Sequence, residues 1–108
     1  EPCSLCLSAI TFAGFDNFYY LFPYQSTSDE FNIPHDLNIL KEVFNVKDGK
    51  YIKKNSYWRS INIISLINEL PKEKVKDIMI ALNNIKNTYK ELSQKYQSNK
   101  IANNIPLK

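Results

Sequence analysis

The most regular pattern of apolar and polar positions runs through residues 71–98. Apolar side chains recur there at alternating spacings of three and four, which places them on one face of an α-helix. This apolar seam consists of Val75, Ile78, Leu82, Ile85, Tyr89, Leu92 and Tyr96. A seam this regular needs a partner surface, and other apolar segments of the chain can cover it. The pattern predicts a long C-terminal helix within an intramolecular bundle rather than a free coiled coil.

Residues 1–23 carry apolar and aromatic side chains almost all round a helix. Asp16 is the only charged residue between residues 3 and 22. The pattern predicts a buried N-terminal helix that is interrupted near Gly14 and ended by Pro23. The run is long enough to raise membrane insertion, but its polar residues and its lack of flanking bases disfavour that interpretation.

The next segments alternate between loop and helix signals. Residues 24–33 are rich in Ser, Thr, Gln and Asp, which indicates a polar loop. A short helix is expected to begin near Pro34, where Asp36 would be stabilised by the exposed amide dipoles of the first turn. The apolar face of this helix consists of Leu37, Leu40 and Phe44.

Asp48-Gly49 is the one strong turn signal, because this dipeptide readily adopts positive φ angles. Two structures can use it: a short β-hairpin that pairs residues 44–46 with residues 51–53, or a simple exit from the preceding helix. We favour the helix exit, because a two-stranded hairpin needs a packing partner to be stable.

Residues 57–69 carry isoleucine and leucine over more than half of a helical circumference, which predicts a buried helix. Their β-branched content leaves a strand as the alternative. Pro71 follows almost at once, so this helix and the long one should form an antiparallel hairpin. The predicted fold is a single all-α domain of four or five helices, with residues 34–98 as scaffold and residues 99–108 as a flexible tail.

Composition supports an ordered, helix-rich domain. The 108 residues are 44% hydrophobic and 13% aromatic, and they include only two glycines. The net charge of +3 is unevenly spread: residues 1–45 carry six acidic and one basic side chain, whereas residues 46–108 carry five acidic and thirteen basic ones. The basic half could steer an acidic partner, but attraction between the two halves explains the asymmetry without one.

Cys3-Ser4-Leu5-Cys6 is the most specific local pattern. A Cys-x-x-Cys at a helix start can be a redox dithiol, because the amide dipoles stabilise a thiolate, but no strand precedes it here. A zinc site wants four ligands, and the chain has one histidine, so no metal is expected. A Cys3-Cys6 disulfide, bridges to a partner chain and buried free thiols remain open. The chain begins at Glu1 rather than at a methionine, which fits either a secreted protein after processing or a fragment.

Enzymatic activity is not expected. His35 lies at a predicted helix start with no nucleophile near it in sequence, and no catalytic triad, glycine-rich phosphate loop or cofactor motif can be assembled. The favoured function is therefore that of a small secreted or exported helical protein that binds another protein or serves as a subunit of a complex.

Two segments supply the candidate partner contacts: the aromatic run near the N-terminus and the basic loop in the middle of the chain. The residues are Phe15, Phe18, Tyr19, Tyr20, Tyr24, Lys47, Lys50, Tyr51, Lys53, Lys54, Trp58 and Arg59. Three alternatives use the same features. Aromatic residues between helices could hold a small apolar ligand or lipid, the N-terminal run could insert into membranes as a toxin, and the basic loop could bind nucleic acid by phosphate contacts and stacking.

Overall fold

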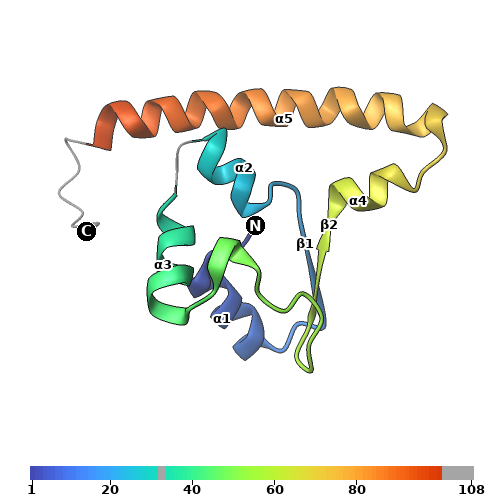
Figure 1. Ribbon diagram of the computed structural model, residues 1–108. Coiled ribbons are helices and arrows are strands. Elements are labelled where there is room, and N and C mark those ends of the chain that lie inside the picture. The colour runs from blue at the N-terminus through green and yellow to red at the C-terminus, as the bar shows by residue number, and fades with distance from the viewer. Residues whose placement is uncertain (32–33, 101–108) are drawn as a thin grey trace.

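A computed structural model describes residues 1–31 and 34–100. In this part the chain forms five α-helices, one short 3₁₀-helix and two strands (Figure 1). The helices are α1 (Ser4–Ala13), α2 (Tyr24–Asp29), α3 (His35–Phe44), α4 (Ile63–Asn68) and α5 (Lys72–Asn99). The 3₁₀-helix is η1 (Lys47–Gly49), and the strands are β1 (Asn17–Tyr20) and β2 (Arg59–Asn62).

The two strands pair in parallel, although the sequence was expected to give helices at both places. Asn17 lies opposite Arg59, and Tyr20 lies opposite Asn62. The predicted buried N-terminal helix is only partly right: α1 has Cys3 as its N-cap and ends before Gly14, which has φ 73°, but none of its residues is buried. Beyond Gly14 the chain does not resume a helix, because the aromatic run of β1 favours a pleated strand that packs against a neighbour.

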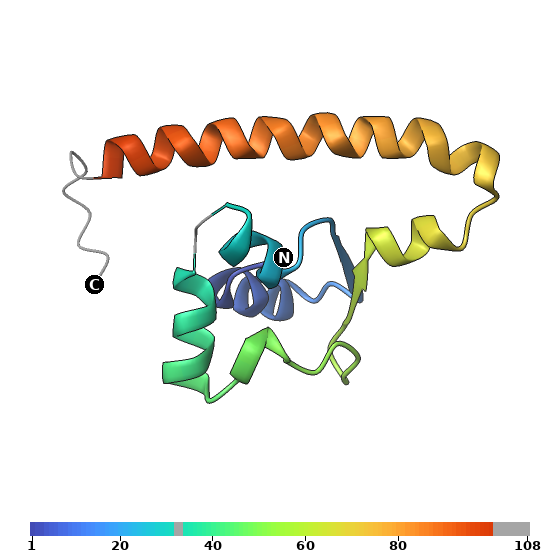
Figure 2. The ribbon, with the colours of Figure 1, turned by 45° about the horizontal axis from the view of Figure 1, so that its top comes forward.

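The prediction of an all-α bundle with a C-terminal helical hairpin is wrong. The first part of the predicted helix at residues 57–69 is strand β2, and only Ile63–Asn68 is helical. This six-residue α4 is too short to match the 28-residue α5, which runs along one side of the molecule (Figures 1 and 2). The long helix itself is confirmed: Pro71 is its N-cap, and Glu73 lies in its first turn.

Of the remaining local predictions, some are confirmed and others are wrong. The helix start near Pro34 is confirmed, with Asp36 in the first turn of α3. The loop predicted for residues 24–33 is wrong for residues 24–29, because Tyr24–Asp29 is helix α2, stabilised by a hydrogen bond from Gln25 to Asp29 one turn later; residues 30–31 form a turn. Residues 32–33 and residues 101–108 of the predicted tail lie outside the described residues.

The β-hairpin that was the alternative at Asp48-Gly49 does not form, and the chain leaves α3 after Phe44 as the favoured interpretation expected. Both residues have the expected positive φ angles, 54° and 64°, but they belong to η1. A tight turn occurs later instead, at residues 55–58. There the Asn55 side chain accepts hydrogen bonds from the amides of Tyr57 and Trp58 at 2.9 and 3.1 Å.

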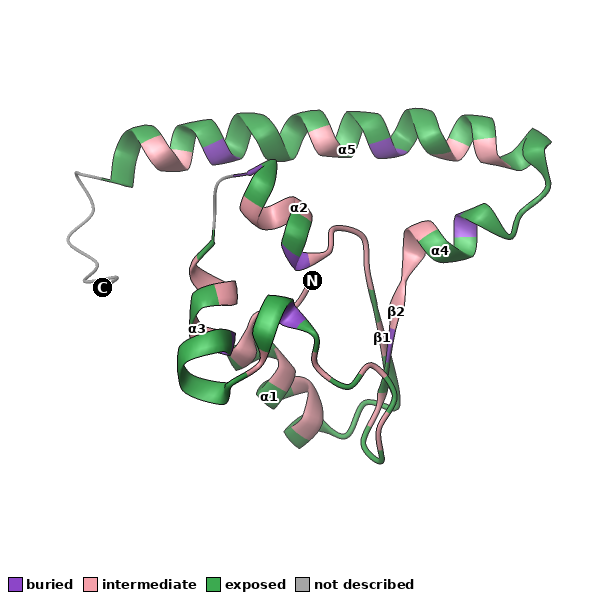
Figure 3. Ribbon diagram, in the orientation of Figure 1, coloured by how far each residue is buried: buried purple, intermediate pink, exposed green. Residues whose placement is uncertain are grey.

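Aromatic rings form two clusters that hold the fold together. In the first, Phe18 and Tyr51 both pack against Trp58, with ring centroids 5.1 and 5.9 Å away. In the second, Phe22 and Phe31 pack against Tyr89 of α5 at 5.2 and 5.8 Å. The second cluster attaches the long helix to the rest of the chain. Even so, most of α5 is exposed, and its buried positions lie on the side that faces the other elements (Figure 3).

Candidate binding groove

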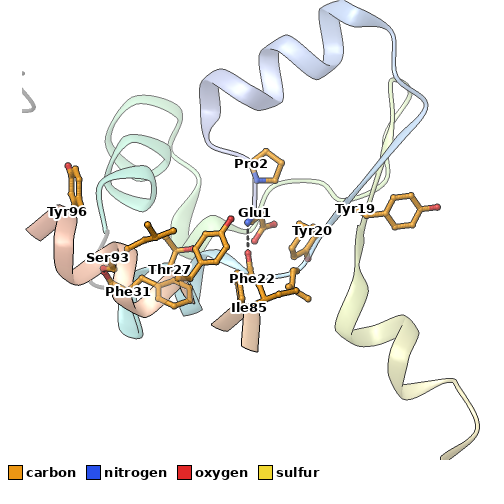
Figure 4. Close-up of a pocket in the computed structure, with 13 residues that line it drawn as sticks. Glu1, Pro2, Tyr19, Tyr20, Phe22, Thr27, Phe31, Ile85, Ser93 and Tyr96 are labelled. Carbon is orange, nitrogen blue, oxygen red and sulfur yellow. Dashed lines mark hydrogen bonds between the residues drawn. The ribbon is translucent and has the colours of Figure 1, made fainter. Parts of the chain in front are cut away.

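An open apolar groove of about 600 Å³ lies between α5 and the chain segment that runs from β1 into α2. The α5 wall consists of Ile85, Tyr89, Leu92, Ser93 and Tyr96. The opposite wall consists of Tyr19, Tyr20, Leu21, Phe22, Thr27 and Phe31, and Glu1 and Pro2 complete the lining. In Figure 4, Phe31, Thr27 and Ser93 lie close together on one side, whereas Tyr20 lies beside Glu1.

The α5 wall is an apolar stripe that the rest of the described chain leaves partly uncovered. Ile85, Tyr89, Leu92 and Tyr96 are spaced by four, three and four residues, so they lie along one flank of the helix. Ile85 is 41% exposed, Tyr89 50% and Leu92 57%. The apolar seam predicted from the sequence thus exists, but this part of it faces the groove and is only partly covered by the core.

Polar contacts of α5, above all that of Ser93, explain why part of the apolar seam faces the groove and not the core. This residue is buried, and its hydroxyl donates a hydrogen bond to the carbonyl of Phe31. Lys86 of α5 pairs with Glu30, whose pKa is lowered by the hydrogen bond from that lysine. These polar contacts fix the rotation of α5 so that Leu92, next to Ser93, points into the groove rather than into the core.

The buried carboxylate of Glu1 contributes to the lining of the groove. The Glu1 side chain is only 2% exposed; it pairs with the Lys53 ammonium and accepts a hydrogen bond from the Tyr24 amide at 3.0 Å. The ammonium also lies 4.2 Å from the ring centroid of Tyr51 and 4.7 Å from that of Tyr20. Burial opposes the charge on Lys53, but its hydrogen bonds to Glu1 and Tyr20 prevail and raise its pKa.

A second, polar recess of about 440 Å³ lies beside the start of β1. Its charged side chains are Asp16, Lys54 and Arg59, and Asn17 and Tyr57 also line it. Within the described residues, neither Lys54 nor Arg59 forms an ion pair. Tyr19 borders both the recess and the apolar groove, so the two meet along β1.

The structure divides the predicted contact residues into two groups. Those on the surface are Phe15, Tyr19, Lys47, Lys50, Lys54 and Arg59. Those buried or half-buried are Phe18, Tyr20, Tyr24, Tyr51, Lys53 and Trp58. Trp58 packs against Phe18 and Tyr51, and the Lys53 ammonium lies over the Tyr51 ring, so these rings make contacts within the fold. Of the candidates, only Tyr19 and Tyr20 line the apolar groove.

The α5 wall was not among the predicted contacts. The signal that could have found it was present, because a regular apolar seam without an equally long partner segment has to face something other than the core. The sequence could not show which end of the seam the core would cover, since this depends on Ser93 and on the path of residues 21–31.

The two cysteines lie at the start of α1 as free thiols. Cys3 is the N-cap: its sulfur accepts a hydrogen bond from the Cys6 amide at 3.4 Å, and its thiol donates to the Cys6 sulfur at 3.3 Å. The side-chain hydrogen bond with Cys3 raises the pKa of Cys6. The sulfur atoms are therefore adjacent but not bonded, and the predicted disulfide is not formed in this structure.

Residues 1–31 and 34–100 contain no cluster of three or more His, Cys, Asp or Glu side chains suited to a metal ion. None of the helices in this part is both long and apolar enough to cross a membrane. No protein-family model, curated protein or solved structure matches this chain.

Proposed function

We propose that this chain is a non-catalytic binding protein that holds an apolar segment of another protein in the groove beside α5. The observation that carries this proposal is the half-exposed stripe of Ile85, Tyr89 and Leu92 over a groove lined with aromatic rings. Apolar side chains on neighbouring turns of one helix are costly to leave in water: full burial of an exposed one contributes about 1.5–3 kcal/mol, so each of these half-exposed residues would gain roughly half of that. Aromatic anchors in such grooves commonly dominate the binding energy of protein interfaces.

The charge around the groove suits an acidic partner. Residues 72–100 carry seven lysines and three acidic residues, so the helix that forms one wall is distinctly basic. Exposed cations at the rim of an interface accelerate association with an oppositely charged surface and contribute less to the final affinity. The partner segment should therefore combine apolar side chains for the groove with acidic residues at its edges.

Site-specific photo-crosslinking tests this proposal in the natural source of the protein. A benzoylphenylalanine at position 92 should crosslink to one defined protein, because Leu92 borders the groove. The matched control is position 80: Ile80 is 55% exposed on the same helix but does not line the groove. Crosslinking should disappear when Ile85 is also changed to Asp. Equal labelling from both positions, or none from position 92, would contradict the proposal.

A carrier of a small apolar ligand or lipid is the second candidate. The groove volume falls within the range of small-molecule sites, about 300–1,000 Å³. Against it, the groove is open and its α5 wall remains half-exposed. Native mass spectrometry of protein from the natural source separates the two: a lipid-sized mass bound in one copy supports the carrier, whereas a retained second chain supports the binding protein.

A further inference from the structure

Within the described part of the chain, the outer edge of β1 has no main-chain hydrogen-bond partner. The Arg59 amide donates a hydrogen bond to the Asp16 carbonyl at 3.0 Å, and the strands pair in parallel register from that point. In a parallel ladder, alternate residues of one strand point their N–H and C=O groups toward the other strand. Phe18 and Tyr20 therefore face β2, whereas the main-chain groups of Asn17 and Tyr19 face away from it.

The two strands differ in what lies on their outer sides. The outer side of β2 is already bonded, because the Ser60 amide donates to the Lys53 carbonyl at 2.8 Å and Lys54 bridges to Arg59. Within residues 1–31 and 34–100, no main-chain hydrogen bond reaches the outer side of Asn17 or Tyr19. A two-stranded parallel sheet is normally extended or covered, and an open edge is a template for another strand (Figure 1).

The two ends of this edge present different chemistry. Beside Asn17 lies the polar recess, where the cations of Arg59, opposite Asn17 on β2, and of Lys54, on the far side of β2, outnumber the carboxylate of Asp16 and form no ion pair within the described residues. From Tyr19 onward the edge leads into the apolar groove. An extended segment that lies along β1 would meet positive charge at one end and apolar surface at the other.

We propose that an extended acidic and apolar segment of a partner protein adds to the outer edge of β1 as a third strand. This inference rests on the proposed function, since it specifies how the partner binds. Main-chain hydrogen bonds to Asn17 and Tyr19 give affinity, and alternate side chains of the segment give specificity. An acidic side chain of the segment lies near Arg59, and apolar side chains enter the groove. A second copy of this chain is a poorer occupant, because its own β1 is uncharged and offers only Asp16, the residue before the strand, to the cations of Lys54 and Arg59.

Selection of random peptides of about twelve residues on the full chain tests the mode of binding directly, because strands and helices differ in side-chain period. Enriched peptides should carry apolar residues at every second position and acidic residues at one end. Apolar residues spaced by three and four would show that the groove takes a helix, which would overturn strand addition and keep the proposed function. The absence of any enriched peptide would overturn both.

Hydrogen exchange with the strongest selected peptide locates the strand. The amides of Asn17 and Tyr19 should exchange more slowly by at least about tenfold when the peptide is bound, because they gain acceptors. The amide of Phe18 already faces β2 and should change little. Protection of Asn17 and Tyr19 without peptide, accompanied by a dimeric mass, would assign the edge to a second copy and overturn the proposal.

A pair of variants at one position separates the main chain from the side chain. Tyr19→Ala and Tyr19→Pro both remove the ring, but only proline removes the outward N–H. Peptide affinity should therefore be lower in Tyr19→Pro than in Tyr19→Ala by at least about tenfold. Equal affinities in two folded variants would contradict strand addition. If Tyr19→Pro does not fold, Arg59→Gln decides: it should weaken the binding of acidic peptides and reduce the salt dependence of binding. An unchanged affinity would overturn the proposal, which places an acidic side chain of the segment near Arg59.

Discussion

Gly49 lies against the ring of Tyr24 so closely that a Cβ atom at this glycine would be 2.5 Å from Tyr24 Cδ2. Gly49 also has φ 64° and is buried. Gly49→Ala should therefore lower the free energy of unfolding by about 3 kcal/mol, from backbone strain and from displacement of a buried ring. Urea unfolding followed by circular dichroism measures this loss.

Gly14 provides the matched control. It has φ 73° at the end of α1, but no atom lies within 4 Å of a Cβ built there. Gly14→Ala should therefore cost only the backbone strain, about 1 kcal/mol. Equal losses at the two glycines would show that the contact between Gly49 and Tyr24 is not tight.

The hydrogen bond from Trp58 Nε1 to Thr11 Oγ1, at 2.7 Å, joins the tight turn at residues 55–58 to α1. Thr11→Val keeps the shape of the side chain but removes the acceptor, which leaves a half-buried indole N–H unpaired. The free energy of unfolding should fall by about 1–2 kcal/mol. Trp58 is the only tryptophan, so its fluorescence in a urea titration reports both the local change and global unfolding.

Thr88→Val is the corresponding control on α5, where the hydroxyl is exposed and bonds only to the Asn84 carbonyl of its own helix. This variant should change the free energy of unfolding by less than about 0.5 kcal/mol. A loss at Thr11 no larger than the loss at Thr88 would mean that the indole finds another acceptor.

Local signals in the sequence predicted helix ends better than they predicted the fold. Gly14 ends α1, Pro34 and Asp36 begin α3, and Pro71 begins α5. Each of these residues restricts the main-chain conformation, or interacts favourably with the main-chain groups at a helix end, without help from distant parts of the chain. The parallel sheet could not be predicted from such local signals. β1 and β2 are separated by 38 residues, and each is a four-residue strand that looks like part of an apolar helix until its partner is known.

The candidate site, too, could be predicted from the sequence only in part. The sequence showed a regular seam on α5 but not its rotation, which depends on a hydrogen bond from Ser93 to Phe31 across 62 residues. The aromatic and basic residues chosen as contacts were selected by type. Trp58, Tyr51 and Lys53 are residue types common in binding surfaces. In the structure, however, the rings of Trp58 and Tyr51 pack against each other, and the Lys53 ammonium lies over the Tyr51 ring.

Stability should fall at alkaline pH. Burial raises the pKa values of Tyr24 and Tyr51 above the ordinary value near 10, so the folded state favours their neutral forms. The contribution of each tyrosine is fully present below about pH 10 and is lost as pH rises above it, by at most about 1.4 kcal/mol per pH unit. The pKa of Lys53 is also raised, so its contribution has the same sign.

Urea midpoints measured from neutral to alkaline pH check this expectation. The midpoint should be constant up to about pH 9 and fall above about pH 10. A variant with Tyr24→Phe and Tyr51→Phe should show a smaller decline, because it lacks both hydroxyl groups. A midpoint that rises with pH in this range, or an equal decline in the variant, would exclude the buried tyrosines as the cause.

The rotation of α5 makes a direct prediction about two leucines of the same seam. Leu82 is 9% exposed in the core, whereas Leu92 is 57% exposed in the groove. Leu82→Ala should lower the free energy of unfolding by about 2–3 kcal/mol, while Leu92→Ala should change it by less than about 0.5 kcal/mol. Both substitutions replace leucine with an equally good helix former, so helix propensity cancels in the comparison. Urea unfolding of the unbound chain gives both values. Similar losses would mean that the whole seam is buried and that the groove is closed, whereas a loss confined to Leu82 leaves Leu92 free for a partner.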